Sequence, residues 1–412
     1  MHTEWEKKVL DEIELDELIE VLKNLQAFHS WSGEEQEAAE FMVSWMEDNG
    51  FETQLQEVEP KRSNALGFLR GSGEGPSLMF NGHLDIDPMP MDYKGDPWDC
   101  RIENGVMYGH GIANMKAGVT AMTIAAAAIK RAGVPLKGDI MVAGVVGELQ
   151  AGVGTHHMLQ SGIVPDVAVV PEPSELKVRT VHAGVLELLI HCRGKSGWVG
   201  ATFMYKTVSA VEKMYKVIDG LNNLKFSFAG REDLPHLPRL VVGAIMGGIT
   251  EEYAVHRPAF VPDFCTIAVD IRIPPGMTFD ETVADIRKML DDLKAEDPDM
   301  NTEIELPPAA YRQPWYAMQV AMPPLDTPHS EPIVQTVAAR HKFVTGEEAH
   351  VGIEMPGSHA GTDAGHLSAA GTKALVYGPT SNAFFESQVV LDHLLTCCKV
   401  HALTALDMCG DV

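Results

Sequence analysis

The sequence has little positive charge and no long apolar run. Its 32 lysine and arginine residues are outnumbered by 58 acidic residues, which gives a formal charge of −26 over 412 residues. That charge repels phosphate backbones and anionic lipid, so we expect no nucleic-acid or membrane-surface partner. A local pocket can still bind a small acidic substrate. No stretch approaches the roughly 18 uninterrupted apolar residues that a membrane span needs.

The sequence also lacks a signal-peptide pattern and a cysteine framework. The segment Met1–Glu20 is charged and amphipathic, without an apolar core of signal-peptide length. The cysteines show no zinc-finger or disulfide spacing, which favours free thiols in a reducing cytoplasm. They are Cys100, Cys192, Cys265, Cys397, Cys398 and Cys409.

Short apolar runs that alternate with helical stretches predict an α/β domain. The runs Leu78–Phe80, Ile140–Val146 and Val167–Val170 are typical of strands covered on both faces. The alanine-rich segment Val119–Ala132 predicts a crossover helix. We therefore expect a mainly parallel sheet covered by helices, with the active site at the strand ends. Further helices are expected at 15–25, 38–46, 331–344 and from about 387, with a strand at 374–377.

A second pattern begins near Val185 and predicts a smaller α+β unit inserted into the first. Its strands and helices are expected at 186–192, 208–221, 240–245, 265–273 and 279–294. A segment rich in proline, aromatics and methionine, Leu306–Pro328, is interpreted as the return linker. Since 412 residues favour two domains, we predict a catalytic domain of residues 1–184 and 325–412. The predicted insertion, residues 185–324, is a two-layer lid or dimerisation domain.

Six short motifs occur in the order found in one group of metallohydrolases. They are FNGHLD (Phe80–Asp85), GHGIANMKAG (Gly109–Gly118), GELQAGVGT (Gly147–Thr155), PEPSE (Pro171–Glu175), GKSGWVGA (Gly194–Ala201) and NAFFE (Asn382–Glu386). Together they resemble the aminoacylase, carboxypeptidase G and acetylornithine deacetylase family of zinc metallopeptidases. The resemblance implies two metals in the larger domain, a lid domain through which two chains dimerise, and hydrolysis of a C–N bond.

The ligands of one metal are kept. A strand that ends in Gly-His-x-Asp places His83 and Asp85 on the same side of the chain. This suits a metal-binding imidazole that a nearby carboxylate orients. By resemblance, His83 and Glu172 bind the first metal, and Asp85 supports His83 in the catalytic machinery. Taken alone, a histidine at the end of a strand is more often structural than a metal ligand, and a Glu-Pro pair is common in loops.

The bridging position and the ligands of the second metal are changed. By resemblance, Asn114 replaces the aspartate that bridges the metals, and its neutral amide offers only one carbonyl oxygen. A helix N-cap is the alternative role for Asn114, and both roles can hold together. Leu149 and Asn382 replace the ligands that belong to the second metal alone. We therefore predict one divalent metal per chain, most simply zinc or manganese, held by His83, Glu172 and Asn114.

The remaining catalytic residue is Glu148, which by resemblance is the general base. The alternative is a solvated loop carboxylate, but Glu148 follows the buried run Ile140–Val146, where a carboxylate usually has a task or a partner. One metal is chemically sufficient, because it lowers the pKa of bound water to roughly 7 and a nearby carboxylate can then take the proton.

The lid motif carries its own change. By resemblance, Trp198 replaces a histidine that stabilises the oxyanion, and its flat ring favours stacking on a planar substrate; core packing is the alternative. Arg257 is a candidate partner for a substrate carboxylate on charge grounds. His359, in a glycine-rich loop that by resemblance approaches the substrate, is a further candidate contact. Histidines that could supply an extra ligand or hydrogen-bond donor are His110, His182, His359 and His366.

Three functions are compatible with these residues. The first is metal-dependent hydrolysis of an amide C–N bond in a small carboxylate-bearing substrate. The second is release of ammonia from an aromatic amino acid of the nitroanthranilate type, for which a tryptophan above a flat ring makes physical sense. The third is a non-catalytic binding protein on a hydrolase scaffold, against which the retained Glu148 counts. Release of an amine or of ammonia distinguishes the first two.

Overall fold

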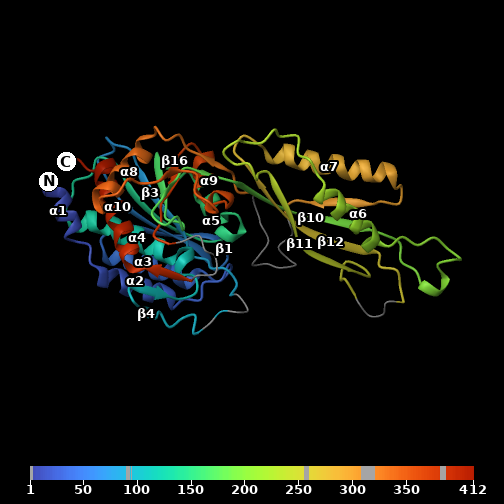
Figure 1. The fold of residues 1–412 in the computed structure, drawn as a ribbon. Coiled ribbons are helices and arrows are strands. Elements are labelled where there is room, and N and C mark those ends of the chain that lie inside the picture. The colour runs from blue at the N-terminus through green and yellow to red at the C-terminus, as the bar shows by residue number, and fades with distance from the viewer. Residues whose placement is uncertain (1–2, 90–92, 94, 255–258, 308–320, 381–386) are drawn as a thin grey trace. The chain divides into compact units, whose positions relative to one another are not determined.

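The computed structural model describes residues 3–89, 93, 95–254, 259–307, 321–380 and 387–412 (Figure 1). The chain divides into two compact units. The large unit includes Met1–His182 and Met322–Val412, and the small unit begins at Ala183. The described part of the small unit lies within residues 183–307, together with Ala321.

The large unit is built on an eight-stranded sheet in the order β1-β2-β6-β3-β7-β16-β8-β15. Neighbouring strands from β6 to β16 run parallel, whereas β1 and β2 form an antiparallel hairpin at one edge. The mainly parallel sheet predicted from the apolar runs is confirmed. Its strands are β1 Glu52–Glu59, β2 Arg62–Leu69, β3 Leu78–His83, β6 Ile140–Val145, β7 Val167–Val170, β8 Val178–Arg179, β15 Val351–Gly352 and β16 Lys373–Val376.

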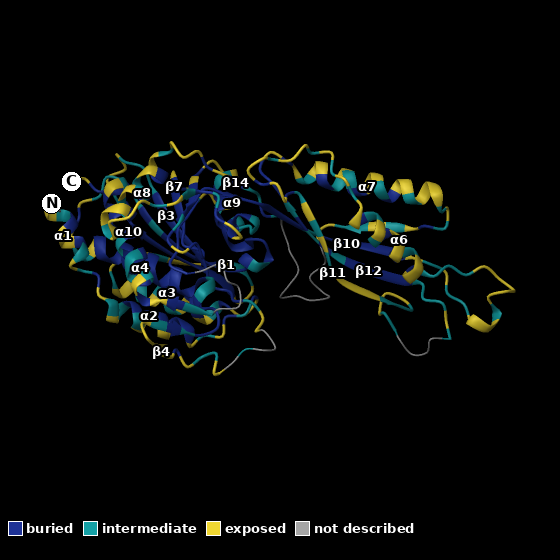
Figure 2. Ribbon diagram, in the orientation of Figure 1, coloured by how far each residue is buried: buried dark blue, intermediate teal, exposed yellow. Residues whose placement is uncertain are grey.

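Helices cover both faces of this sheet, and Figure 2 shows its central strands as buried. One face packs on α1–α4, α8 and α10, and the other packs on α5 and α9. The final helix begins at Leu391 rather than near Ser387, because strand β17 (Gln388–Val390) precedes it and pairs with β5 (Val106–Tyr108). The helices are α1 Glu4–Leu10, α2 Leu15–Gln26, α3 Gln36–Asp48, α4 Ala117–Arg131, α5 Val153–Gln160, α8 Pro332–Thr345, α9 Ala364–Ala369 and α10 Leu391–Cys409.

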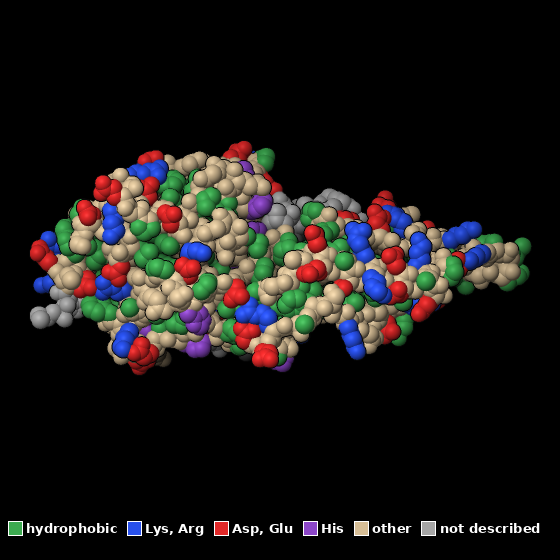
Figure 3. All heavy atoms as spheres, turned by 90° about the horizontal axis from the view of Figure 1, so that it is seen from above, with side chains coloured by type: hydrophobic (Ala, Val, Ile, Leu, Met, Phe, Trp, Pro, Cys, Tyr) green, Lys and Arg blue, Asp and Glu red, His purple; other side chains and the backbone are tan. Residues whose placement is uncertain are grey.

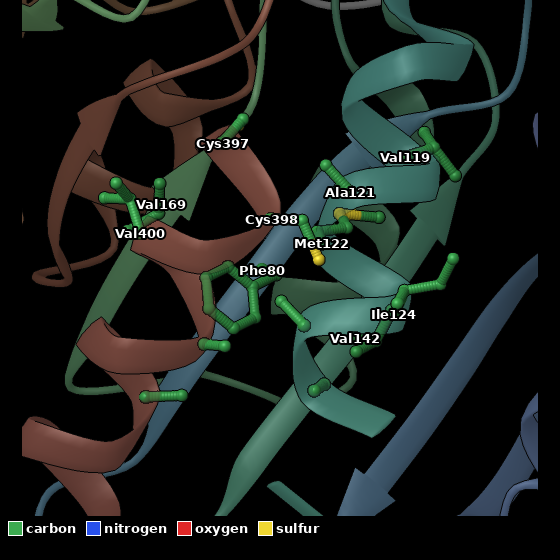
Figure 4. Packing of buried hydrophobic residues seen from close by; sticks show 14 of the residues in the cluster. Phe80, Val119, Ala121, Met122, Ile124, Val142, Val169, Cys397, Cys398 and Val400 are labelled. Atoms are coloured by element: carbon green, nitrogen blue, oxygen red, sulfur yellow. The ribbon is translucent and has the colours of Figure 1, made fainter. Parts of the chain in front are cut away.

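Helix α4 lies at the centre of the core. Its small alanine side chains allow close packing beside α10, and Phe80 of β3 is packed with side chains of both helices (Figure 4). Residues Ile112–Arg131 are long and apolar enough to cross a membrane, but 89% of the apolar window is buried inside the unit. The apolar composition of α4 is therefore accounted for by its place in the protein core.

The small unit is a two-layer α+β structure, as expected. Its antiparallel sheet has the order β11-β12-β10-β13, and α6 and α7 pack on it around a separate apolar core. On the face seen in Figure 3, acidic and basic side chains are interspersed over this unit. Its elements are β10 Gly184–Arg193, α6 Ala210–Asn222, β11 Arg239–Gly248, β12 Phe264–Ile273, α7 Phe279–Glu296 and β13 Thr302–Glu305.

Candidate metal centre and active site

Three polar side chains follow three neighbouring parallel strands. His83 is the last residue of β3, Glu148 follows β6 after the left-handed Gly147, and Glu172 lies two residues beyond β7. The strands are adjacent in the order β6-β3-β7, so their carboxyl ends meet at one edge of the sheet. This edge is where α/β sheets place their ligands.

The side chains converge on the Nε2 atom of His83. Glu172 Oε1 lies 3.3 Å from it, Glu148 Oε2 4.0 Å, and Asn114 Oδ1 3.2 Å. His83, Glu148 and Glu172 are all buried, and one ligand atom from each lies within 4.8 Å of the others. Mixed nitrogen and oxygen donors without thiolate suit zinc, manganese or iron. The residues present therefore fit a divalent cation.

Asp85 holds the site together in two ways. Its backbone carbonyl accepts a hydrogen bond from His83 Nδ1 at 2.8 Å, which leaves Nε2 as the atom that faces the acidic groups. Its carboxylate, 3.6 Å from His83 Nδ1, accepts the backbone N–H groups of Glu148 and Leu149, each at 3.1 Å, and the Ser32 hydroxyl at 3.0 Å. The backbone of Asp85 thus orients the imidazole, while its carboxylate positions the turn that carries Glu148.

Asn114 does not cap α4. Its backbone and that of Met115 have non-helical dihedral angles, and Lys116 is the N-cap of a helix that begins at Ala117. The capping interpretation is therefore wrong. The Asn114 side chain instead faces His83 with its oxygen and hydrogen-bonds the carboxylate of Asp87.

The centre carries an excess of buried negative charge. Burial alone lowers the pKa of His83, but the facing carboxylates of Glu172 and Glu148 outweigh it, and the pKa lies well above its ordinary value. Burial raises the pKa of Glu148 well above its ordinary value, and Glu172 and Asp363 raise it further. A divalent cation held here would offset this crowding of carboxylates. The alternative weighed for Glu148, a solvated loop carboxylate, is wrong, since only 8% of the residue is exposed.

The sequence interpretation missed Asp363, which is 1% exposed. Burial raises the pKa of Asp363 to about 7, and the negative charge of Glu172 adds to the rise. The carboxylate receives a hydrogen bond from Thr155. A Cβ atom on Gly152 would lie 2.4 Å from Asp363 Oδ1, so the glycine turn after Glu148 is shaped around this carboxylate. Asp363 lies in a loop that the sequence analysis selected only for its histidines. Nothing in the sequence predicted that its carboxylate would lie against the glycine turn.

A buried ion pair between Arg62 and Glu35 supports the Glu148 turn. Arg62 of β2 donates to both carboxylate oxygens of Glu35, at 2.6 and 2.9 Å, and to Gln150 Oε1 at 2.8 Å. Because Gln150 lies two residues beyond Glu148, this pair connects the Glu148 turn to β2 and to the N-terminal helices. Neither Arg62 nor Glu35 belongs to a motif, so the sequence gave no reason to select them.

A second buried arginine supports the loop of Glu172. Arg179 donates to Glu354 at 2.8 Å and to the carbonyl of Pro173 at 2.5 Å. On the other side of the loop, a Cβ on Gly118 would lie 2.1 Å from the Pro171 carbonyl, so only glycine lets α4 approach so closely. The loop that presents Glu172 is therefore fixed from both sides.

The other candidate residues lie apart from this donor group or outside the described residues. His110 Nε2 hydrogen-bonds the Asp87 carbonyl at 2.7 Å, His182 Nε2 pairs with the Thr362 hydroxyl at 3.0 Å, and His366 Nε2 with the Ala151 carbonyl at 2.6 Å. His359 ends a short 3₁₀ turn and is not in the group with metal-binding geometry. Arg257 and Asn382 lie outside the described residues.

Trp198 belongs to the small unit and is 54% exposed. Its backbone N–H donates to the Tyr205 hydroxyl at 3.0 Å, and it forms an isolated bridge with Phe260. Core packing, the alternative weighed for this residue, is therefore wrong. The indole is presented on the surface of the unit.

Comparison with known proteins decides the family. The model described as peptidase family M20/M25/M40 matches residues 79–407. The chain belongs to the M20 peptidase family. Members of the family are metal-dependent hydrolases, and this M20 chain is a hydrolase acting on carbon–nitrogen bonds. The interpretation as a non-catalytic binding protein is set aside.

The named relatives of this M20 chain include a deformylase and a deacetylase. It is 27% identical, over 88% of its length and 87% of the relative's, to N-formyl-4-amino-5-aminomethyl-2-methylpyrimidine deformylase of Halalkalibacterium halodurans. It is 28% identical to acetylornithine deacetylase of Vibrio atlanticus over 70% of its length and 74% of the relative's. The fold matches human carnosine dipeptidase 1 with a TM-score of 0.73, at 15% identity over 98% of this chain and 99% of that structure.

Proposed function

We propose that this chain is a single-metal amidohydrolase that removes a small acyl group from the nitrogen of a small amine. The observation that carries the proposal is the convergence of Glu172 Oε1 and Asn114 Oδ1 on His83 Nε2, at 3.3 and 3.2 Å. Those three residues would hold the cation. Leu149, where the family's second metal would take a carboxylate, offers an apolar side chain that cannot coordinate.

The chemistry follows from the position of Glu148 beside that donor set. A bound divalent cation supplies Lewis-acid polarisation of the amide carbonyl and lowers the pKa of water. Glu148 takes a proton from the attacking water and delivers it to the amine nitrogen as the C–N bond breaks. Asp85 keeps Glu148 in place through the two backbone N–H groups of the turn.

The names of the relatives support an N-acyl amine as substrate, since one is a deformylase and another a deacetylase. We also propose that the substrate carries a carboxylate. Arg257 and His359 are the candidate residues to bind it. Trp198, exposed on the small unit, is proposed as a further substrate contact.

The six cysteines are unpaired and buried, which supports a reducing, cytoplasmic location.

A substrate panel tests this function. The zinc- or manganese-loaded protein is expected to release formate or acetate from N-formyl-4-amino-5-aminomethyl-2-methylpyrimidine, N-acetylornithine or a related N-acyl amine, with one amine formed per acid. A chelator is expected to abolish the release, and added metal to restore it. Ammonia release from aminobenzoates without acid release would instead favour the aromatic aminohydrolase. Turnover that persists after complete metal removal would contradict the mechanism.

We also propose that two chains associate through β11. Among the described strands β11 pairs only with β12, so its other edge is available, and Val241 and Ile245 are 45% and 55% exposed. Unprotected edge strands readily pair with a second copy, and a twofold dimer is the commonest assembly.

Placing a charge on this edge is expected to separate the chains. Ile245→Asp should give a monomer in sedimentation or light scattering, because each chain would bury an unpaired carboxylate in the proposed interface. Val164→Asp is the matched control, since Val164 is 45% exposed on the large unit. A wild-type protein that is monomeric at micromolar concentration, or an unchanged Ile245→Asp dimer, would contradict the proposal.

A further inference from the structure

An aromatic cluster in the large unit has no part in the proton transfers described above. It consists of Trp31, Tyr93 and Trp98 around the imidazole of His110. Their ring centroids lie 5.7, 6.0 and 6.1 Å from that of His110. The two indoles meet edge to face at 5.8 Å. All three surrounding rings are half-buried, so each keeps part of its surface accessible. One face of Trp98 is covered by the imidazole of His29, which is stacked on it with ring centroids 3.9 Å apart.

The aromatic cluster is joined to the metal centre by a short chain of contacts. His110 Nε2 bonds the backbone carbonyl of Asp87 at 2.7 Å. The Asp87 carboxylate is hydrogen-bonded by Asn114, whose oxygen faces His83 Nε2 at 3.2 Å. Asp87 itself is half-buried and follows His83 by only four residues. The aromatic cluster is therefore linked through His110, Asp87 and Asn114 to the residue on which the metal-donor group converges.

The hydrogen-bonding character of this region is set by the tautomer of His110. A carbonyl oxygen only accepts, so Nε2 carries the proton, and Nδ1 of the neutral imidazole is an acceptor. Nδ1 is buried and has no hydrogen-bond partner among the described residues, and His110 as a whole is 5% exposed. The Asp87 carboxylate is a second acceptor. The region thus combines flat aromatic faces with two acceptors.

We propose that the aromatic cluster and Asp87 bind the amine half of the substrate, and that this half is a flat nitrogen heterocycle bearing amino groups. The proposal rests on the amidohydrolase function and names its substrate class. Ring stacking and cation–π attraction favour a flat, protonatable ring on the indoles. Its N–H groups meet the Asp87 carboxylate and His110 Nδ1, and that ring nitrogen has no other partner among the described residues. A substrate carboxylate at this position would be repelled by Asp87.

Binding of amines, rather than turnover, tests the proposal. Calorimetry on the metal-loaded protein is expected to show 4-amino-5-aminomethylpyrimidine binding at least about tenfold more tightly than benzylamine, which lacks the ring nitrogens and the ring amino group. Ornithine, which has no flat ring, is expected to bind more weakly still.

Three variants locate the binding. Trp98→Leu and Asp87→Asn are each expected to weaken pyrimidine binding by roughly tenfold or more. Trp45→Leu is the control, because Trp45 is also half-buried in the large unit but stacks with Arg131, 5.7 Å from its ring. Thermal unfolding of each variant shows whether it is folded. Asp87→Asn keeps the size of the side chain and provides the answer if Trp98→Leu does not fold.

Equal affinity for the three amines, or unchanged pyrimidine affinity in both cluster variants, would overturn the proposal. The outcome is separable from that of the amidohydrolase function. Cluster-dependent binding without hydrolysis of any N-acyl amine would retain the ring site and contradict the function. Hydrolysis of N-acetylornithine without pyrimidine binding would retain the function and contradict the ring site.

Discussion

Replacing Glu148 by glutamine is expected to lower turnover by about 10²–10⁴ while metal content stays near that of the wild type. Glutamine keeps the size of the side chain and the backbone N–H that donates to Asp85 at 3.1 Å. It cannot take a proton from water or return one to the leaving nitrogen. Steady-state rates and elemental analysis on the same preparation measure both effects.

The same substitution at Glu187 provides the control. Glu187 is a half-buried carboxylate on β10 of the small unit, where burial raises its pKa to about 7, and it is not in the metal-donor group. Glu187→Gln is expected to leave turnover near the wild-type value. Normal turnover of Glu148→Gln would show that Glu148 is not the base. Loss of metal from that variant would make Glu148 a ligand, as the 4.0 Å distance from its Oε2 to His83 Nε2 permits.

Replacing His83 by alanine is expected to remove both the metal and the activity. His83 supplies the nitrogen atom on which the acidic groups converge, so its loss should exceed the roughly 10–100-fold effect of changing an outer partner of a metal site. His366→Gln is the matched comparison, because His366 is also buried but bonds the Ala151 carbonyl at 2.6 Å. That variant should retain one metal per chain. Elemental analysis after dialysis measures both.

The number of metal ions per chain tests the assignment of a single-metal centre directly. Two tightly bound ions per chain in fully active wild-type protein would disprove a single-metal centre. A His83→Ala variant that kept its metal would show that the donor group lies elsewhere. Loss of metal from His366→Gln would bring that histidine into the ligand set.

The strands and helices that position the site could be predicted because the apolar runs in their sequences indicate which segments are buried. The run Val167–Val170 corresponds to β7 as the structure has it, and the alanine-rich helix begins two residues before its predicted start. The hairpin β1–β2 was not predicted, because β1 is largely exposed and has no regular apolar alternation. Pairing of its residues with β2 depends on contacts that a local pattern does not contain.

In the candidate site, too, some residues could be predicted from the sequence and others could not. His83, Glu148 and Glu172 were identified by resemblance to the family's motifs, and in the structure each lies at or just beyond the end of a strand at the same sheet edge. Asp363 and Arg62 were missed because their importance comes from tertiary contacts with the Glu148 turn, not from neighbours in sequence. Asn114 was assigned correctly to the vicinity of His83 but given a capping role that the backbone does not support.

The hydrogen bonds between the Asp85 carboxylate and the Glu148 turn determine which residues position 149 can accept. This carboxylate holds residues 148 and 149 by their backbone N–H groups, each at 3.1 Å, and makes no use of the side chain at 149. Any residue except proline supplies that N–H. Position 149 can therefore carry leucine in place of an acidic side chain without displacing Glu148. In the proposed single-metal centre, the ligand of a second ion is dispensable at this position while the Glu148 turn keeps its place.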